Sequence, residues 1–368
     1  MSGVTRRRAV SASLPVFPWD TLAEAAATAR AHPDGIVDLS VGTPVDAVAP
    51  VIRAALAAAS DQPGYPTTAG TDALRDAMRA ALARRYGVTG LGEGAVLPVI
   101  GSKELIAWLP TLLGLGEADT VVVPELAYPT YEVGARLSGS AVLRSDAPGN
   151  PAALLYLNSP SNPTGRVLDA ARLRELIAWA RDCGAVVVSD ECYLGLGWDR
   201  QPVSVLHPSV SDGDHSGLLA VHSLSKTSSL AGYRAGFVAG DPALVGELLA
   251  VRRHAGMMVS TPVQAAMVAA LTDDDHEHDQ RQRYARRRAA LLPTLRDAGF
   301  RVDHSEAGLY LWATRGEPAR ATVDWLAARG ILVAPGEFYG PDGAAHVRVA
   351  LTATDERIDA AVARLVTR

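Results

Sequence analysis

The sequence predicts an α/β fold, in which a large domain with a mostly parallel sheet flanked by helices is joined to a smaller α+β domain. Two patterns in the 368 residues lead to this prediction. Short, nearly continuous apolar runs alternate with helix-type segments through most of the chain, as is typical of a parallel sheet buried on both faces. After about residue 255, a long charged helical stretch leads into a shorter α+β-type region. We therefore expect a large domain at 45–255 and a small domain formed by 1–44 and 256–368.

The individual elements can be placed along the chain. The strands of the large sheet are expected at the apolar runs 121–124, 153–158, 185–190, 218–223 and 235–240. A helix is expected over 169–184, because Asp169 can cap its first turn and Gly184 can end it. In the small domain we expect a strand at "HVRVAL" and a terminal helix after it.

Composition and charge argue against several classes of protein. The chain is 48% hydrophobic and 20% charged, as in ordinary soluble globular proteins. Its net charge of −5 provides no basic field for nucleic acid or for an anionic membrane surface. The longest apolar run, which begins at Leu105, contains a proline and is shorter than a membrane-spanning helix. Two cysteines are too few for a disulfide framework, so we expect a cytoplasmic protein without nucleic-acid or membrane partners.

Polar side chains follow successive predicted strands. Asn162 lies in "NSPSNPTG" after the second strand, Asp190 and Tyr193 lie in "SDECY" after the third, and Lys226 follows the fourth. Taken singly, Asn162 could serve a turn and Asp190 could cap a helix. In open α/β sheets, however, ligands bind outside the carboxyl ends of the strands. The four side chains together therefore predict one active site.

The segment "SLSKTSSLAGYRAGF" surrounds Lys226 with small residues and hydroxyl groups and contains no acid. A nucleophilic lysine needs a neutral amine, which a desolvated, cation-rich pocket favours. Ser223, Ser225 and Arg234 would suit a phosphate dianion, since arginine offers paired donors. An imine-forming lysine beside a phosphate site indicates pyridoxal phosphate, and Asp190 is the acid expected for its ring nitrogen.

Four motifs together carry a resemblance to a known family. "SLSK" with an arginine eight residues later, "SDECY", "NSPSNPTG" and "AYPTY" resemble the fold-type I pyridoxal-phosphate aminotransferases of class I/II. The resemblance extends from "VDLSVGTP" to "HVRVAL", which is almost the whole chain. Segments such as "GYPTTAGTDALRDAM" and "GSKELIAWLPTLLGLG" are most similar to actinobacterial N-succinyldiaminopimelate aminotransferases.

The resemblance implies a catalytic role for three residues. Lys226 would bind the cofactor and move the proton during transamination, Asp190 would pair with the ring nitrogen, and Tyr193 would bond the phenolic oxygen. The same resemblance implies further cofactor contacts from Asn162, Tyr128, Ser102, Lys103, Ser223, Ser225, Arg234 and Tyr65. Among these, Tyr128 would stack on the ring, and Tyr65 would reach the phosphate of the neighbouring subunit in a homodimer. The substrate would be bound by Arg348, the backbone of Gly42 and Asn162.

The implied reaction is transfer of an amino group between glutamate/2-oxoglutarate and another amino acid/2-oxo acid pair. The narrower resemblance implies N-succinyl-LL-2,6-diaminopimelate, in lysine biosynthesis. Gly256 stands where aspartate aminotransferases of the classical subgroup have a substrate-binding arginine, and Met257 and Met258 could line a roomier pocket there. Three alternatives remain: another substrate (aspartate, alanine or an aromatic amino acid), a carbon–sulfur β-lyase on the same fold, and the sensor domain of a transcription regulator.

The segment "DDDHEHD" (273–279) has residue types that bind metals, but it lies where a charged helix is expected to begin. We interpret it as a solvated helix start. The chain has no HExxH or CxxC spacing, so no catalytic metal is predicted.

Overall fold

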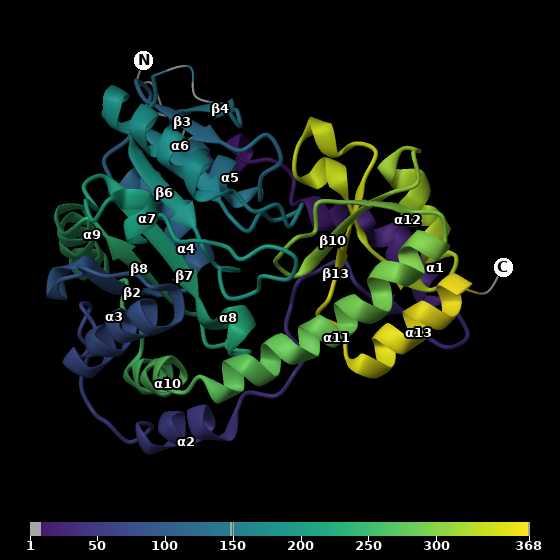
Figure 1. Cartoon of the computed structure of the whole chain (residues 1–368), viewed down its shortest axis with the longest axis horizontal. Coiled ribbons are helices and arrows are strands. Elements are labelled where there is room, and N and C mark those ends of the chain that lie inside the picture. The colour runs from purple at the N-terminus through teal and green to yellow at the C-terminus, as the bar shows by residue number, and fades with distance from the viewer. Residues whose placement is uncertain (1–8, 148, 150, 367–368) are drawn as a thin grey trace, which may run out of the picture.

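A computed structural model describes residues 9–147, 149 and 151–366. Within these residues, a seven-stranded sheet forms the centre of the larger part of the molecule (Figure 1). Its strands lie in the order β2 (Val96–Ile100), β8 (Ala235–Gly240), β7 (Leu218–Ser223), β6 (Val186–Asp190), β5 (Leu154–Asn158), β3 (Thr120–Val123) and β4 (Ala141–Arg144). Strand β8 runs antiparallel to both of its neighbours, and the other adjacent pairs are parallel. The predicted mostly parallel sheet is therefore confirmed.

Helices cover both faces of this sheet, which explains why its strands are apolar without alternation. In β5, Leu155 and Leu157 face one apolar cluster, whereas Leu154 and Tyr156 face the other. The first cluster is completed by α2 (Pro50–Ala58), α3 (Asp72–Tyr86), α6 (Ala170–Cys183), α7 (Pro208–Ser211) and α10 (Thr261–Thr272). The second is completed by α4 (Ser102–Leu112), α5 (Thr130–Ser138) and α9 (Pro242–Ala255).

Helix α6 has the two caps that the sequence predicts. The Asp169 side chain accepts a hydrogen bond from the Arg172 amide at 2.8 Å, and Gly184 ends the helix with φ of +73°. That left-handed conformation favours glycine. The predicted helix and its bounds are confirmed.

The smaller part of the molecule contains an antiparallel sheet and a short parallel pair. The sheet has the order β12 (Ala334–Pro335), β13 (Val347–Ala350), β10 (Tyr310–Thr314) and β9 (Arg301–Asp303), and the pair consists of β1 (Val37–Asp38) and β11 (Ile331–Leu332). The helices here are α1 (Ala23–Arg30), α11 (Asp275–Asp297), α12 (Ala319–Ala327) and α13 (Asp355–Val366). In the molecule as a whole, short 3₁₀ turns occur at Val10–Ser13, Pro18–Leu22, Glu93–Ala95, Gly336–Phe338 and Pro341–Gly343. No helix among the described residues has the length and apolar character that a membrane span requires.

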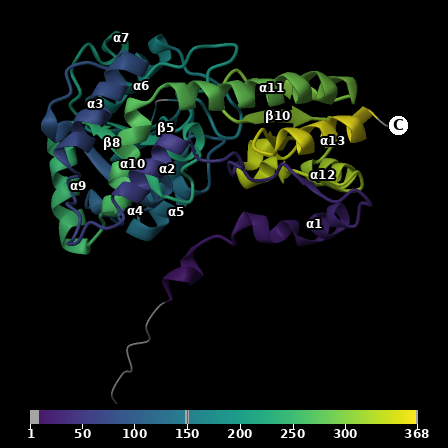
Figure 2. The same cartoon turned by 90° about the horizontal axis from the view of Figure 1, so that it is seen from below.

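Helix α11 runs from the larger part of the molecule to the smaller one, and the N-terminal helix α1 lies against the smaller part (Figures 1 and 2). Helix α10 packs with the large-sheet cluster through Met267 and Leu271. The domain division at 255/256 stays a prediction, and the packing of α10 favours a boundary further along the chain, within α11.

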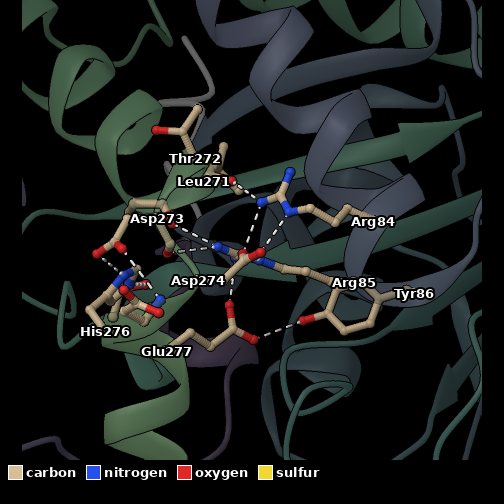
Figure 3. Close-up of polar contacts among 12 residues, drawn as sticks. Arg84, Arg85, Tyr86, Leu271, Thr272, Asp273, Asp274, His276 and Glu277 are labelled. Carbon is tan, nitrogen blue, oxygen red and sulfur yellow. Dashed lines mark hydrogen bonds and ion pairs between the residues drawn. The ribbon is translucent and has the colours of Figure 1, made fainter.

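The start of α11 is held by ion pairs to α3 (Figure 3). Asp274 lies 2.6 Å from Nε of both Arg84 and Arg85, and Glu277 lies 2.5 Å from Nη1 of Arg85. Arg84 and Arg85 hold the pKa of Asp274 well below its usual value. The predicted helix start is confirmed, but the segment is less solvated than expected, since the Glu277 side chain is only 13% exposed.

Candidate active site

One cavity of about 490 Å³ brings together the predicted site residues. It lies at the carboxyl ends of β5, β6 and β7, where the strand-end argument places a ligand. The predicted residues that line it are Gly42, Ser102, Lys103, Tyr128, Asn162, Asp190, Tyr193, Ser223, Ser225, Lys226, Arg234 and Arg348. Tyr65 is the exception, because this residue is 98% exposed and lies outside the cavity. Its role in a neighbouring subunit stays a prediction.

Lys226 lies on α8 (Leu224–Thr227), a single turn that begins where β7 ends. Ser223 caps this turn by accepting a hydrogen bond from the Ser225 amide at 3.1 Å. The Lys226 Nζ donates to the backbone oxygen of Gly42, and burial lowers the pKa of the amine. A side chain at Gly42 would collide with the hydroxyl of Tyr310, so the close approach of Tyr310 to this part of the backbone requires glycine. The amine therefore faces a cavity in which its neutral form is favoured.

Asp190 is buried at the end of β6 and accepts two hydrogen bonds. The Tyr131 hydroxyl donates to its Oδ2 at 2.8 Å, and the Cys192 amide donates to its Oδ1 at 3.2 Å. Burial raises the pKa of Asp190, and these donors oppose the rise because they stabilise the carboxylate. The sequence reasoning missed Tyr131, although it is the second tyrosine of the "AYPTY" motif.

An anion site lies at the start of α4. Gly101, with φ of +80°, places Ser102 at the first turn of this 11-residue helix, where backbone amides point outward. The guanidinium of Arg234 lies so close against Gly101 that a Cβ there would collide with it. Ser225 lines the same end of the cavity. Helix amides, hydroxyls and a guanidinium together suit a phosphate group.

Arg348 lies on β13 and is almost completely buried, at 1% exposure. Its Nη1 donates to Asn162 Oδ1 at 2.9 Å and its Nη2 donates to the backbone oxygen of Ser40 at 2.7 Å. The guanidinium carbon lies 3.9 Å from the ring centre of Tyr310, and Nε has no hydrogen-bond partner among the described residues. A buried guanidinium without a carboxylate partner calls for an anionic ligand.

The structure adds residues that the sequence reasoning did not select. Tyr310 lines the cavity, and its hydroxyl lies 3.1 Å from that of Tyr193. Phe17 and Trp19, from the segment before α1, form another part of the wall. No local motif marks these three residues, because they reach the cavity from distant parts of the chain.

The distribution of lysine in the sequence also marks this cavity. The chain contains 35 basic residues, and only two of them are lysines, Lys103 and Lys226. Both lysines line this cavity.

Charge is unevenly distributed in the cavity. Its lining contains Lys103, Lys226, Arg234 and Arg348, but Asp190 is the one acid among the described lining residues. None of the four cations forms an ion pair with a described carboxylate; Lys103 instead contacts aromatic rings, and Arg348 bonds neutral oxygens. In a protein of net charge −5, this excess indicates ligands that carry several negative charges.

Comparison with known proteins agrees with this geometry. Residues 34–365 match the family described as aminotransferase class I and II. The chain belongs to this family. It is 76% identical to a probable aminotransferase of Mycobacterium tuberculosis, Rv1178, over 98% of this chain and 87% of that protein. It is 61% identical to the 4-dedimethylamino-4-oxo-anhydrotetracycline transaminase OxyQ of Streptomyces rimosus, over 96% of this chain and 99% of that protein.

Solved structures of aminotransferases have the same fold. A probable N-succinyldiaminopimelate aminotransferase of Thermus thermophilus superposes with a TM-score of 0.85 and 28% identity, over 94% of this chain and 98% of that chain. The expected aminotransferase fold is thus confirmed, and the aminotransferase is pyridoxal-phosphate dependent. The donors at the start of α4, the amine of Lys226 and the carboxylate of Asp190 fit the phosphate, the aldehyde and the ring nitrogen of that cofactor.

Proposed function

We propose that this aminotransferase moves an amino group between glutamate/2-oxoglutarate and a long acidic amino acid/2-oxo acid pair, with N-succinyl-LL-2,6-diaminopimelate as the first candidate. The excess of cations over acids in the cavity carries the proposal. Arg234 and the start of α4 suit the cofactor phosphate, and Lys226 suits its aldehyde. Arg348 and Lys103 then remain for the substrate, which favours a substrate with two carboxylates.

Lys103 is placed to meet the second carboxylate. Its Nζ lies 5.6 Å from the ring centre of Phe17 and 5.7 Å from that of Tyr128. These contacts hold the ammonium between two aromatic side chains and leave its hydrogens for another partner. The resemblance gave Lys103 a role at the phosphate, and its position between these rings favours the substrate instead.

The pocket expected beside Gly256 receives no support. Gly256 ends α9 with φ of +70°, and neither Met257 nor Met258 is among the described residues that line the cavity. The long substrate is therefore assigned to the side of the cavity formed by Lys103, Phe17 and Trp19.

The side chains around the reacting atoms have separate tasks in this proposal. When bound, pyridoxal phosphate supplies an aldehyde and an electron-withdrawing ring. Arg348 would bind the α-carboxylate through paired donors and so orient Cα. Lys226 would take the proton from Cα, because its buried amine has a lowered pKa and is available as a base. Asp190, kept ionised by Tyr131, would hold the proton on the ring nitrogen.

We also propose that the active unit is a homodimer. Tyr65, which the resemblance places at the phosphate of the neighbouring subunit, is 98% exposed in the single chain. An exposed tyrosine of this kind can contact a second copy of the chain.

A second candidate substrate class is a polycyclic aromatic ketone. The 61% identical relative is named for such a substrate, and the aromatic side chains of Phe17, Trp19 and Tyr128 line one side of the cavity here. Stacking on these rings would favour a large planar acceptor. The two classes differ in charge, so their use of Lys103 would differ as well.

A substrate panel with the purified enzyme tests the proposal. Glutamate is supplied as donor, and amino products are measured by mass spectrometry for the oxo acids of succinyldiaminopimelate, aspartate, alanine and phenylalanine, and for a polycyclic aromatic ketone. We expect the highest kcat/KM with the long acidic oxo acid. A higher value with the polycyclic ketone would replace the first candidate by the second. Release of pyruvate from cystathionine without any amino transfer would support the lyase and overturn the proposal.

A further inference from the structure

Two buried polar side chains face each other behind Asp190. Glu191 follows β6 directly and His222 lies on the neighbouring strand β7. Glu191 Oε2 and His222 Nε2 are 3.5 Å apart, and their side chains are 1% and 6% exposed. Neither atom has another hydrogen-bond partner among the described residues.

Besides His222, the polar groups that bond the Glu191 carboxylate are the hydroxyls of Ser189 and Ser204 and one backbone amide. The other carboxylate oxygen of Glu191 accepts from the Val205 amide at 2.8 Å. The imidazole ring is stacked on two aromatic rings. Its centre lies 6.1 Å from the ring centre of Tyr86 and 4.9 Å from that of Phe237. The Tyr86 hydroxyl points away toward Glu277 (Figure 3). The titratable groups nearby are Asp190 and Cys192 on the same segment, Arg85 and Tyr86 on α3, and Glu277 on α11.

The number of titratable protons on the pair decides how much charge it buries. With no added proton, the neutral imidazole can still donate from Nε2 to the carboxylate, but the charge of Glu191 stays buried without a counter-charge, next to the charge of Asp190. With two protons, a buried imidazolium faces a carboxylic acid. With one added proton, a single hydrogen bond satisfies both atoms and the pair carries no net charge, and a buried charge without a counter-charge is costly. One proton is thus the state that fits the geometry.

We propose that Glu191 and His222 share one proton in a hydrogen bond that ties β6 to β7 and so fixes the spacing between Asp190 and Ser223. The backbone ladder between the two strands ends at this point, with the Glu191 amide donating to Val221 O at 2.9 Å. Glu191 is next to Asp190 in the chain and His222 is next to Ser223, and both of these neighbours line the cavity. The pair contacts neither cofactor nor substrate, and the inference goes beyond the proposed substrate.

The direction of each pKa agrees with a shared proton. Burial raises the pKa of Glu191 to about 7 and lowers the pKa of His222 to about 3. Between about pH 4.5 and about pH 6.5 the native pair therefore holds one proton, on the carboxyl group. The unfolded pair also holds one proton in this range, but on the imidazole, whose ordinary pKa is about 6.5. Unfolding then changes the proton count of the intact pair by almost nothing.

Single substitutions at the pair change the number of protons taken up on unfolding, and they change it in opposite directions. Glu191→Gln leaves a neutral native imidazole that gains a proton on unfolding. His222→Phe preserves the stacked ring and leaves a native carboxylic acid that loses its proton. At about pH 5.5 we expect the first variant to take up about one proton more than the wild type on denaturation, the second about one fewer, and the double variant the same number as the wild type.

The experiment is a proton count at constant pH. The holoenzyme and its variants are denatured with guanidinium chloride at about pH 5.5, and the acid or base needed to hold the pH is measured. Glu191→Gln has nearly the shape of the native residue and decides the outcome alone if His222→Phe fails to fold. Equal proton uptake by Glu191→Gln and wild type would overturn the proposal, because it would mean an ionised Glu191 beside an unprotonated His222.

A second readout tests the positioning role. Glutamine can still donate a hydrogen bond to His222, whereas leucine fills similar space and cannot. We expect Glu191→Gln to keep the equilibrium affinity for pyridoxal phosphate within about twofold and Glu191→Leu to lose about tenfold. Equal affinities would show that the residue only fills space. Neither readout uses a substrate, so a failure here is distinct from a failure of the proposed function.

Discussion

The two ends of the active-site cavity are built in different ways. At the cofactor end, Asp190 and Ser223 are the last residues of the adjacent strands β6 and β7, Lys226 follows β7, and the backbone ladder of the sheet holds the two strands side by side. At the substrate end, Phe17, Trp19 and Lys103 meet through aromatic contacts between distant segments, and Phe17 is 52% exposed. A sheet edge gives a rigid site, whereas the sequence of a short N-terminal segment can change with little effect on the fold. We infer that the chemistry resides at the first end and the substrate choice at the second.

The largest expected effect is at the cofactor end. Lys226→Ala should lower kcat by about 10,000-fold, because no other lysine except Lys103 could replace its amine. Lys226→Arg is the matched control. It retains the positive charge but cannot give a neutral amine, so it should be equally inactive. Normal turnover by the arginine variant would show that Lys226 acts by charge alone.

Arg348 lies between the two ends and should produce the next largest effect. Arg348→Lys keeps the charge but loses the paired donors, and KM for glutamate should rise about 100-fold. Steady-state kinetics with varied glutamate measure this change, with circular dichroism as the check on folding. An unchanged KM would remove Arg348 from substrate binding.

Tyr131 tests how the cofactor end keeps Asp190 ionised. Tyr131→Phe removes one donor to the carboxylate, and the affinity for pyridoxal phosphate should fall about tenfold. Burial already raises the pKa of Asp190, and loss of this hydrogen bond raises it further. The fall in cofactor affinity on acidification should therefore begin at a higher pH than in the wild type. Titration of the apoenzyme with cofactor across pH measures both effects. A fall in affinity that begins at the same pH as in the wild type would contradict the role given to Tyr131.

The smallest effect is expected at the substrate end. Lys103→Met should raise KM for dicarboxylic substrates and leave KM for alanine unchanged. The rise should be only about fivefold, because an exposed ion pair contributes little. Lys103→Arg should retain most of the preference for dicarboxylates. Equal losses with alanine and glutamate would move Lys103 to the cofactor phosphate, as the resemblance implied.

The same contrast separates what the sequence predicts from what it does not. The buried strands, the caps of α6 and the residues after β5, β6 and β7 follow from local patterns. The antiparallel direction of β8 does not, since a continuous apolar run looks alike in either direction. Tyr310 and Trp19 were also missed, because β10 and the N-terminal segment reach the cavity only through tertiary packing. Lys103 and Lys226, the two lysines of the chain, were both predicted, Lys103 through the resemblance.

The most direct test asks which lysine binds the cofactor. Holoenzyme is treated with borohydride to make the bond between cofactor and protein permanent, digested, and analysed by mass spectrometry. With two lysines in the chain, the result is unambiguous. We predict the cofactor mass on the peptide that contains Lys226 and an unmodified Lys103. Cofactor on Lys103, or on neither lysine, would contradict the assignment of the two ends of the cavity.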